Sequence, residues 1–271
     1  MSAPLTISLD DPRLEPYRNL TDTNLTRWRH QFVVEGEKLV QRLLASRLEV
    51  VSIVVDQRSW ARLPDGLPPA VDVLVVGDGE VPKLIGFNFH RGMLACALRP
   101  PAARLESLLH TDSSRRTLIV CPQLDDPENL GAILRIGAAF GVAGVLVGAR
   151  APDPLSRRVL RVSMGAALEL PVVRSADLDR DFALLRSAGF DTIATVLNPE
   201  AQKLADTLPA ARQAIVLGSE GHGLDSRWIA ACDRQITIGM QPRVDSLNVA
   251  VAAGIFLYHL TQNPAPSSGI R

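Results

Sequence analysis

The residues from Leu124 to Arg135 carry the side chains of this chain best suited to chemistry. They follow the apolar run 118–121 and read Leu-Asp-Asp-Pro-Glu-Asn-Leu-Gly-Ala-Ile-Leu-Arg, which predicts a strand, a polar loop and a helix. We expect Asn129 to cap this helix and Arg135 to project from its second turn. On a regular helix the two residues lie roughly 240° apart around the axis and do not share a face. Arg135 can then reach a ligand above the sheet, although a capped helix with a solvated arginine explains the stretch equally well.

A second stretch, residues 215–224, predicts another strand followed by a glycine-rich loop. Gly218, Gly221 and Gly223 permit positive φ and close approach of the backbone to a ligand, and Glu220 is the fixed charge in this loop. The glycine order is not the dinucleotide-binding fingerprint, and there is no phosphate-loop lysine. This argues against a nucleotide-dependent oxidoreductase. We expect His222 to be a residue of a surface loop.

A third stretch, residues 236–249, predicts a strand that ends at Ile238, a loop, and the start of the last helix. Ser246 is a good candidate for the N-cap of that helix. Its neighbour Asn248 then falls in the first turn, and capping leaves it unexplained.

The three stretches should meet at one edge of a parallel sheet. Each connects a strand to a helix, and in an open parallel sheet ligands bind beyond the carboxyl ends of the strands. The stretches contain no Ser/His/Asp set and no cluster of metal ligands. We therefore predict a site for positioning and polar recognition rather than for covalent or metal chemistry. Its side chains would be Asn129, Arg135, Glu220, Ser246 and Asn248.

The elements that position these loops alternate regularly from residue 117 onwards. Strands and helices that alternate, with apolar strands, predict an α/β fold with a mostly parallel sheet covered by helices on both faces. In the last helix, Ala250 and Gly254 lie beside an apolar stripe and would permit close approach of a second helix. The predicted strands are 118–122, 144–147, 170–173, 191–196, 214–217 and 235–238, and the predicted helices include 156–163, 178–188, 226–231 and 246–262.

The first hundred residues predict a smaller α/β unit. Strands are expected near 31–34, 50–55, 71–76 and 91–98, and helices near 24–30, from about 36 and at 78–84. The run Arg99-Pro100-Pro101 stops the last strand, because proline cannot continue a ladder. We therefore expect domains at 1–103 and 117–264, a linker with a short helix at 104–116, and a frayed tail at 265–271.

Charge and cysteine content restrict the setting of the protein. The formal net charge is zero, yet only 3 of the 29 basic residues are lysine, and arginine binds phosphate bidentately. The three scattered cysteines match no metal site, and we find neither a signal peptide nor a membrane span. These features are typical of a protein of the reducing cytoplasm. A local basic patch is formed by Arg150, Arg157, Arg158 and Arg161.

In this order and spacing, the three stretches resemble the signature motifs of the SpoU (TrmH-like) RNA ribose 2′-O-methyltransferases of the SPOUT superfamily. The matching segments are 129–135, 217–223 and 246–249, and 161–166 is similar to the segment between the first two motifs. Residues 34–36 and 90–92 resemble pieces of the family's RNA-binding domain, which is similar to ribosomal protein L30e. The resemblance covers nearly the whole chain. It implies a deep trefoil knot, an exception to the rule that proteins are unknotted, and a homodimer packed through the knot.

The resemblance further implies S-adenosylmethionine as the cofactor and RNA as the substrate. Gly239 departs from the family, which usually has proline there, and this change loosens the loop by releasing a fixed φ. The four arginines of the basic patch are the expected RNA track. The residues implied in cofactor binding are Leu197, Gly218, Ile238, Met240 and Leu247.

By resemblance, Asn129, Arg135, Glu220, Ser246 and Asn248 carry catalysis and local architecture. Arg135 would hold an RNA phosphate and orient the ribose, and a phosphate oxygen would accept the 2′ proton, since a guanidinium is not deprotonated in proteins. The long first domain favours 23S ribosomal RNA as the substrate. Transfer RNA, or a non-catalytic assembly role on the same scaffold, stays open.

Overall fold

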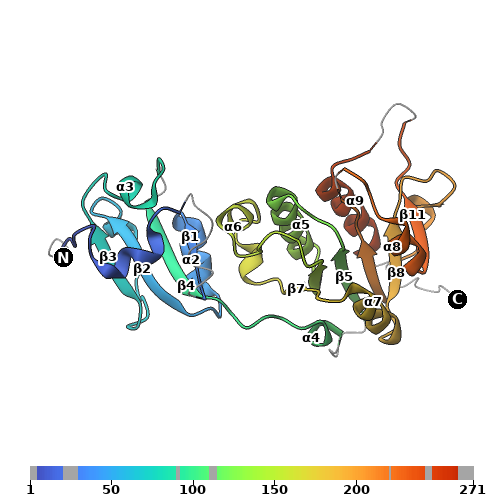
Figure 1. Cartoon of the computed structure of the whole chain (residues 1–271), viewed down its shortest axis with the longest axis horizontal. Helices are drawn as coiled ribbons and strands as arrows, with labels where there is room; N and C mark the ends of the chain where they lie inside the picture. Colours follow the sequence, from blue (N-terminus) through green and yellow to red (C-terminus); the bar gives the residue numbers. More distant parts are fainter. Residues whose placement is uncertain are drawn as a thin grey trace, which may run out of the picture. The chain divides into compact units, whose positions relative to one another are not determined.

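A computed structural model describes residues 5–20, 30–89, 92–109, 115–219, 221–241 and 246–261. The chain divides into two compact units. Figure 1 labels many of their helices and strands. The first unit comprises Met1–Pro101 and Leu155–Glu169, and the second comprises Ala102–Pro154 and Leu170–Arg271. The segment 155–169, which we expected in the catalytic domain, thus clusters with the amino-terminal unit. The predicted helix at 24–30 lies almost wholly outside the described residues, and the tail at 265–271 lies outside them entirely.

The first unit is built on a four-stranded sheet of order β1-β4-β2-β3. β4 runs antiparallel to both β1 and β2, and β3 runs parallel to β2. The strands are β1 (Gln31–Glu35), β2 (Val50–Asp56), β3 (Asp72–Val76) and β4 (Met93–Leu98), and the helices are η1 (Pro12–Tyr17), α2 (Glu37–Ala45), η2 (Trp60–Arg62), α3 (Val81–Ile85), α6 (Arg157–Val162) and η3 (Ala166–Leu168).

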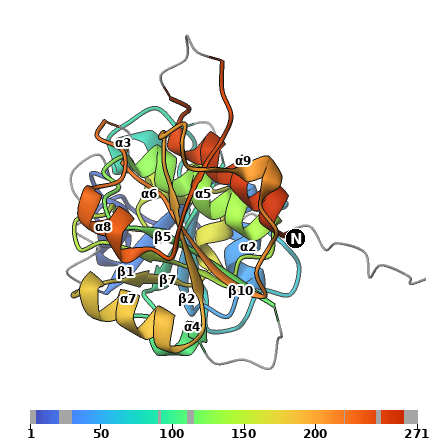
Figure 2. The ribbon, with the colours of Figure 1, turned by 90° about the vertical axis from the view of Figure 1, so that its right-hand side faces the viewer.

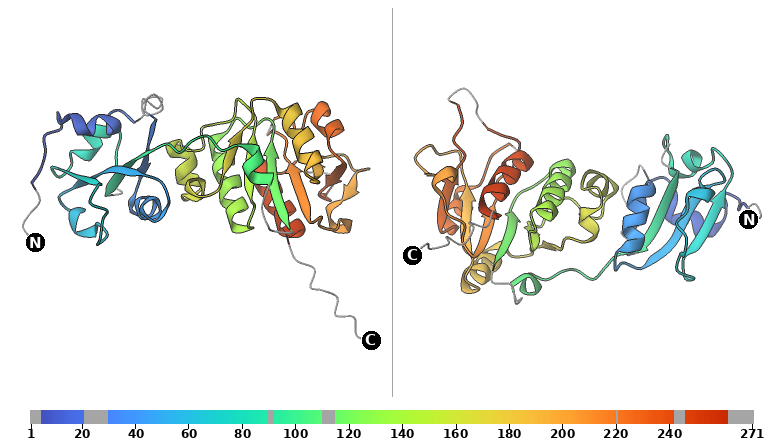
Figure 3. Two further views of the ribbon diagram at one scale, coloured as in Figure 1. Left: turned by 90° about the horizontal axis from the view of Figure 1, so that it is seen from below. Right: turned by 180° about the vertical axis from the view of Figure 1, so that it is seen from behind.

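Strand alternation divides the apolar residues of this sheet between its two faces. Val33, Val54 and Leu94 pack under η1 and α3, where Leu14 and Tyr17 are fully buried. α2 packs against β1 and β4, and Figure 3 shows it running along the sheet. The sequence periodicity therefore predicted most of this unit.

The second unit confirms the predicted α/β fold. It contains a seven-stranded sheet of order β7-β6-β5-β10-β8-β11-β9 in which all paired strands are parallel. The two-residue strand β9 (Gln202–Lys203) escaped prediction because it has no apolar run. The other strands are β5 (Arg116–Cys121), β6 (Gly144–Val147), β7 (Val172–Arg174), β8 (Asp191–Thr195), β10 (Arg212–Val216) and β11 (Arg234–Thr237), and the helices are α4 (Leu105–Leu109), α5 (Pro127–Ala139), α7 (Leu178–Ser187), η4 (Leu204–Asp206), α8 (Ser226–Ala231) and α9 (Val249–Thr261).

Helices cover both faces of this sheet, as expected for parallel strands. On one face, Leu118 and Val120 of β5 share a core cluster with residues of α4, α7 and α8. On the other face, Ile119 approaches Gly137 of α5, and α9 packs against α5. Figure 2 shows α5 and α9 together, on the side of the sheet away from α7. α4 therefore belongs to the core of this unit, although we had placed it in a linker.

The packing of α9 on α5 uses the small residues that we had reserved for a second helix. Ala250 is buried, and a Cβ added at Gly254 would lie 3.8 Å from Ile136 of α5. The rings of Phe140 and Tyr258 meet edge to face with centroids 6.3 Å apart. The small side of α9 therefore permits close approach of a second helix, as expected from the sequence, and that helix is α5.

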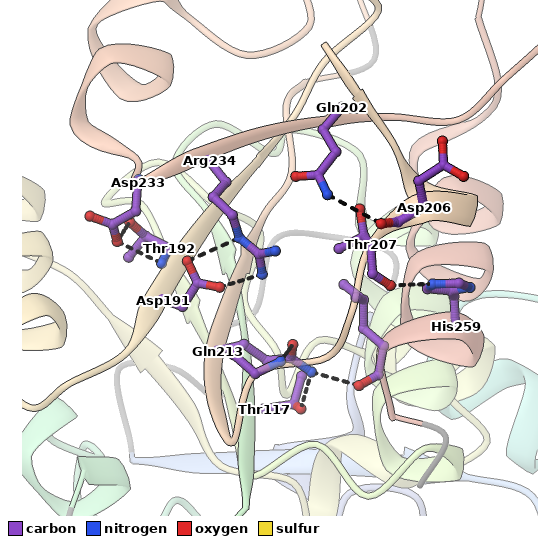
Figure 4. Close-up of polar contacts among 12 residues, drawn as sticks. Thr117, Asp191, Thr192, Gln202, Asp206, Thr207, Gln213, Asp233, Arg234 and His259 are labelled. Atoms are coloured by element: carbon purple, nitrogen blue, oxygen red, sulfur yellow. Dashed lines mark hydrogen bonds and ion pairs between the residues drawn. The ribbon is translucent and has the colours of Figure 1, made fainter. Parts of the chain in front are cut away.

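The carboxyl-terminal end of α9 is fastened to the sheet by a buried glutamine (Figure 4). Gln213 of β10 is 1% exposed, and its Nε2 donates to the Leu260 carbonyl oxygen at 2.8 Å and to Thr117 Oγ1 at 3.0 Å. On the other side, His259 Nε2 lies 2.8 Å from the Thr207 carbonyl oxygen. The bond from Gln213 satisfies the Leu260 carbonyl at the end of α9, where intrahelical donors are missing.

We expect Gln213→Leu to destabilise the second unit by about 2 kcal/mol, because it leaves buried polar partners unsatisfied. Calorimetry of the full chain should show a melting temperature lower by roughly 4–8 °C. The matched control is Gln235→Leu on β11, an exposed glutamine, for which we expect no more than about 0.5 kcal/mol. Equal melting temperatures for the two variants would contradict a fastening role for Gln213.

Candidate active site

A cavity of about 360 Å³ opens at the carboxyl edge of the parallel sheet. Its walls come from the segments that follow β8, β10 and β11 and from the start of α9. This is the place where parallel α/β sheets bind ligands, and the volume is in the range of small-molecule sites, roughly 300–1,000 Å³. The described residues that line it are Thr195, Val196, Leu197, Leu217, Gly218, Ser219, Gly221, His222, Gly223, Leu224, Ile238, Met240, Ser246, Leu247, Val249, Ala252 and Phe256.

This lining is mostly apolar, and its polar groups are hydroxyls, one imidazole and backbone amides. Among the described lining residues none is an aspartate, glutamate, lysine or arginine. Such a wall suits a flat heterocycle with polar edges. Ser246 lies in this wall. So do all five residues that the resemblance implied in cofactor binding, which are Leu197, Gly218, Ile238, Met240 and Leu247.

The glycine-rich loop has a folded shape that leaves no room at Gly218. Ser219 and Gly223 exchange backbone hydrogen bonds of 2.9 and 3.0 Å, so the loop turns back on itself. A Cβ added to Gly218 would lie 2.7 Å from the Gly223 carbonyl oxygen, and closer still to its carbonyl carbon and to the Leu224 nitrogen. The folded loop therefore accepts only glycine at position 218, and Gly218 also lines the cavity.

A hydrogen bond joins the first stretch to the third. Asn248 Nδ2 donates to Asn129 Oδ1 at 2.8 Å, although 119 positions separate the two residues. Asn129 is 7% exposed and lies in the first turn of α5. The convergence that we predicted for these two loops is thus present as a direct contact between their amides.

Two capping assignments made from the sequence are corrected. Asp126, not Asn129, caps α5, and its side chain accepts from the Glu128 backbone N–H at 2.8 Å. Asn248, not Ser246, caps α9, and its Oδ1 accepts from the N–H groups of Ala250 and Val251 at 2.9 and 3.3 Å. Asn129 therefore lies in the first turn of α5 and Asn248 at the cap of α9, and their amides link the two loops.

Arg135 lies on the exposed side of α5, outside the cavity wall. Among the described residues no hydrogen bond or ion pair is formed by its guanidinium. Glu220 lies outside the described residues. The site as described therefore consists of a cavity, a pair of bonded asparagines beside it, and an exposed arginine on the same helix as one of them.

The four arginines of the basic patch have different surroundings. Arg150 and Arg158 are exposed. Arg157 Nη2 donates to Glu35 Oε2 at 2.8 Å, and Arg161 Nη1 lies 3.5 Å from Glu35 Oε1. Two of the four charges thus face a carboxylate of the same unit, which the sequence reading did not foresee.

Some residues at this edge of the sheet could not be recognised from the sequence. Phe256 lines the cavity although it belongs to the apolar stripe of α9, where a cavity residue looks like any core residue. Gly148, which follows β6, is a second such residue. A Cβ at Gly148 would collide with the carbonyl group of Pro122, just before the first stretch. Its only signal was a glycine at a strand end.

The described residues that line this cavity include no cysteine. The three cysteines are free thiols, and burial raises the pKa of both Cys96 and Cys232 to about 12. The thiols of Cys96 and Cys232 therefore stay protonated at neutral pH. Within the described ranges no group of three or more His, Cys, Asp or Glu could hold a metal ion. No helix in the described part of the chain has both the length and the apolar character to cross a bilayer.

The model of the SpoU rRNA Methylase family matches residues 116–258, more than half of the sequence. The chain belongs to this family. It is therefore a methyltransferase of the SpoU type, as the three motifs predicted, and the match spans the cavity wall together with α5 and most of α9.

Relatives of known name agree with this assignment to the SpoU family. An uncharacterized tRNA/rRNA methyltransferase of Mycobacterium tuberculosis is 35% identical over 94% of this chain and 90% of its own length. The 23S rRNA (guanosine-2′-O-)-methyltransferase RlmB of Acinetobacter baylyi is 31% identical over 75% of this chain and 83% of its own. Among solved structures, an AdoMet-bound rRNA methyltransferase from Sinorhizobium meliloti has the same fold, with a TM-score of 0.80 at 23% identity over 94% of this chain and 96% of that one.

Proposed function

We propose that this SpoU methyltransferase transfers a methyl group from S-adenosylmethionine to a ribose 2′-hydroxyl of structured RNA, and that its substrate is 23S ribosomal RNA. The observation that carries the proposal is the meeting of the motif residues at one sheet edge. The five expected cofactor residues line a single cavity, and Asn129 and Asn248 are bonded beside it. The ribosomal substrate is supported by the relative of Acinetobacter baylyi named for 23S rRNA.

The cavity fits a nucleoside with a short polar chain. Leu197, Ile238 and Leu247 offer apolar walls for an adenine, and the bare backbone at Gly218 allows a ligand to approach N–H and C=O groups directly. When bound, the cofactor would supply an electrophilic methyl group on a sulfonium. The protein's part is to hold that group in line with the ribose oxygen, because alignment of reacting atoms supplies much of the rate in such displacements.

Arg135 provides the phosphate contact in this proposal. Its guanidinium is exposed and always charged, and it can bind a phosphate through two parallel N–H donors. A guanidinium cannot take up the 2′ proton. A phosphate oxygen of the RNA held by Arg135 is a chemically suitable acceptor. Asn129 and Asn248 fix the relative position of α5 and α9, so that the arginine and the cavity keep one geometry.

The remaining RNA contacts are assigned to the amino-terminal unit and to exposed arginines. Arg150 and Arg158 are the exposed members of the basic patch and are assigned to phosphates. Glu220 and Ser246 complete the proposed site, Glu220 by tying the loops together. Phosphate contacts of this kind position a substrate without reading its sequence.

The test is transfer of tritium from methyl-labelled S-adenosylmethionine to ribosomal RNA that lacks the modification. We expect labelled RNA, with label in a dinucleotide that resists alkaline hydrolysis because its 2′-oxygen is blocked. Transfer RNA serves as the parallel substrate, since several relatives are named tRNA/rRNA methyltransferases. Label in transfer RNA alone would overturn the choice of ribosomal RNA. Cofactor binding without label in either RNA would favour a non-catalytic assembly role.

The resemblance also implies a knotted chain and a homodimer, and we include both in the proposal. An exposed apolar stripe on α9 supports a dimer. Val251, Ile255 and Tyr258 are 52%, 38% and 61% exposed, and their spacing places them on one face of the helix. Apolar residues gathered on an exposed helix face mark an association surface.

We expect Ile255→Arg to convert the dimer to a monomer, because a charge at the centre of an apolar interface is left without a partner. Size-exclusion chromatography with light scattering gives the mass directly. The control is Ala183→Arg, at an exposed position of α7 on the opposite face of the sheet. A monomeric wild-type protein, or an Ile255→Arg dimer of unchanged stability, would exclude this surface.

A further inference from the structure

Residues 155–169 connect β6 to β7 of the second unit, yet they pack with the first. The chain therefore passes between the units at three places: after Pro101, after Pro154 and after Glu169. The second and third passages are the two ends of one short segment. Whatever holds this segment in the first unit limits how far that unit can move from the methyltransferase fold.

The strongest contact of the segment is made with a buried carboxylate. The side chain of Glu35, at the end of β1, is 4% exposed, and it receives Arg157 Nη2 at 2.8 Å and Arg161 Nη1 at 3.5 Å. The two arginines are four positions apart on α6, so they project from the same face of that helix. A carboxylate buried this deeply needs a cation beside it, and here both cations come from α6.

Arg157 is held by two further groups of the same unit. Its Nη1 donates to the Leu20 carbonyl oxygen at 2.7 Å, and its guanidinium lies over the Phe87 ring, 4.2 Å from the centroid. Its side chain is only 23% exposed. Arginine keeps its charge when desolvated and can use several donors at once. Arg157 is thus built in as an anchor, which leaves little of it for an RNA phosphate.

A second anchor lies at the far end of the segment. The Arg42 guanidinium of α2 donates to the Met164 carbonyl oxygen. Met164 and Gly165 both have positive φ, +52° and +87°, so the chain turns sharply there. A Cβ at Gly165 would lie 3.1 Å from both Leu39 and Arg42. The turn brings the backbone against α2 and requires glycine on grounds of both φ and space.

We propose that Glu35 is a positioning residue for RNA methylation. It acts through Arg157 and Arg161 to keep segment 155–169 in the RNA-binding unit, and the segment carries that constraint to the methyltransferase unit through both of its ends. With the segment anchored, RNA held by the first unit is presented to the cavity at a high effective concentration. When the segment is released from the first unit, the linker after Pro101 is the covalent connection that remains between the two units. This inference rests on the proposed function.

The experiment compares Glu35→Gln with Glu37→Gln in the full chain. Both changes remove one negative charge at nearly the same position, but Glu37 is 38% exposed and lies 3.8 Å from Arg62, not against α6. Hydrogen–deuterium exchange of peptides covering residues 155–169 reports the anchoring without any substrate. We expect exchange there to be on the order of tenfold faster in Glu35→Gln and unchanged in Glu37→Gln, since loss of one partner of a buried pair is strongly destabilising.

Methyl transfer then tests the positioning role. In Glu35→Gln we expect kcat/KM for RNA to fall on the order of tenfold, mainly through KM, with an unchanged Kd for S-adenosylmethionine, because the cavity lies wholly in the other unit. Exchange as slow as in the wild type overturns the proposal, and so does faster exchange with wild-type kcat/KM. If Glu35→Gln does not fold, Arg161→Gln removes the longer contact alone, and the same comparison is made with smaller expected changes.

Failure of the proposed function is recognised separately. A wild-type protein that labels no RNA refutes the methylation proposal, and Glu35 is then judged by exchange together with the Kd for RNA measured on the same variants. Wild-type exchange or wild-type RNA affinity in Glu35→Gln overturns the inference in that case as well.

Discussion

A Gly218→Ala variant is expected to bind S-adenosylmethionine roughly 100-fold more weakly than the wild type. The added methyl group would lie 2.7 Å from the Gly223 carbonyl oxygen and closer to the adjoining backbone atoms, none of which can turn aside as a side chain can. Forcing a methyl group into a packed site costs up to about 3 kcal/mol, and the loop can relieve this cost by moving away from the conformation that lines the cavity. If binding has to restore that conformation, the cofactor Kd rises by roughly a factor of 100. Isothermal titration calorimetry with the cofactor measures this directly.

The matched control is Gly239→Ala in the neighbouring loop. A Cβ at Gly239 meets nothing within 4 Å, its φ is not in the left-handed region, and it lies outside the described cavity wall. We expect cofactor affinity within a factor of two or three of wild type, since substitutions away from packed features change free energies by about 0.5 kcal/mol or less. Equal Kd values for the two variants would show that the folded glycine loop does not form the cofactor site.

An Arg135→Ala variant is expected to lose methyl transfer by roughly 100-fold or more while it keeps the wild-type affinity for S-adenosylmethionine. Arg135 is exposed and absent from the cavity wall, so its loss should misplace the RNA and spare the cofactor. Single-turnover transfer of labelled methyl groups, with calorimetry on the same preparation, separates the two effects. Arg135→Lys should recover only part of the rate, because an ammonium cannot bind phosphate bidentately.

Arg180→Ala is the control for a simple loss of positive charge. Arg180 is an exposed arginine of α7, which covers the opposite face of the same sheet, and its contact with Glu106 is long at 3.7 Å. We expect its transfer rate to match the wild type. A comparable fall in both variants would indicate a general electrostatic effect on RNA binding, and full activity of Arg135→Ala would remove this residue from the proposed site.

The meeting of the three loops followed from local patterns in the sequence. Apolar runs ending in Cys121, Leu217 and Ile238 marked strand ends, and parallel strands bring such ends to one edge. The cavity lies at that edge and its wall contains the expected cofactor residues. This much could be predicted because strand period, strand end and glycine content are properties of short segments.

The residues that cap the amino-terminal ends of α5 and α9 could not be predicted from such local patterns. Asp126 and Asn129 are both good caps, as are Ser246 and Asn248, and propensity alone does not separate them. The choice depends on the contact between Asn129 and Asn248, which involves residues 119 positions apart. Once these two amides are bonded, Asn129 sits within the first turn of α5 and Asp126 remains to cap it.

The sequence alone determined the fold class, the family and the edge of the sheet that carries the site. Tertiary structure decided which unit each segment joins. Helix 157–162 has an ordinary pattern for a helix between two strands, but its arginines find their carboxylate at Glu35, 122 positions from Arg157. Likewise, Gly254 of α9 lies against Ile136 of α5 in the same chain. In both cases, the physical reason is that burial and charge pairing act between distant segments, and local periodicity does not encode which segments meet.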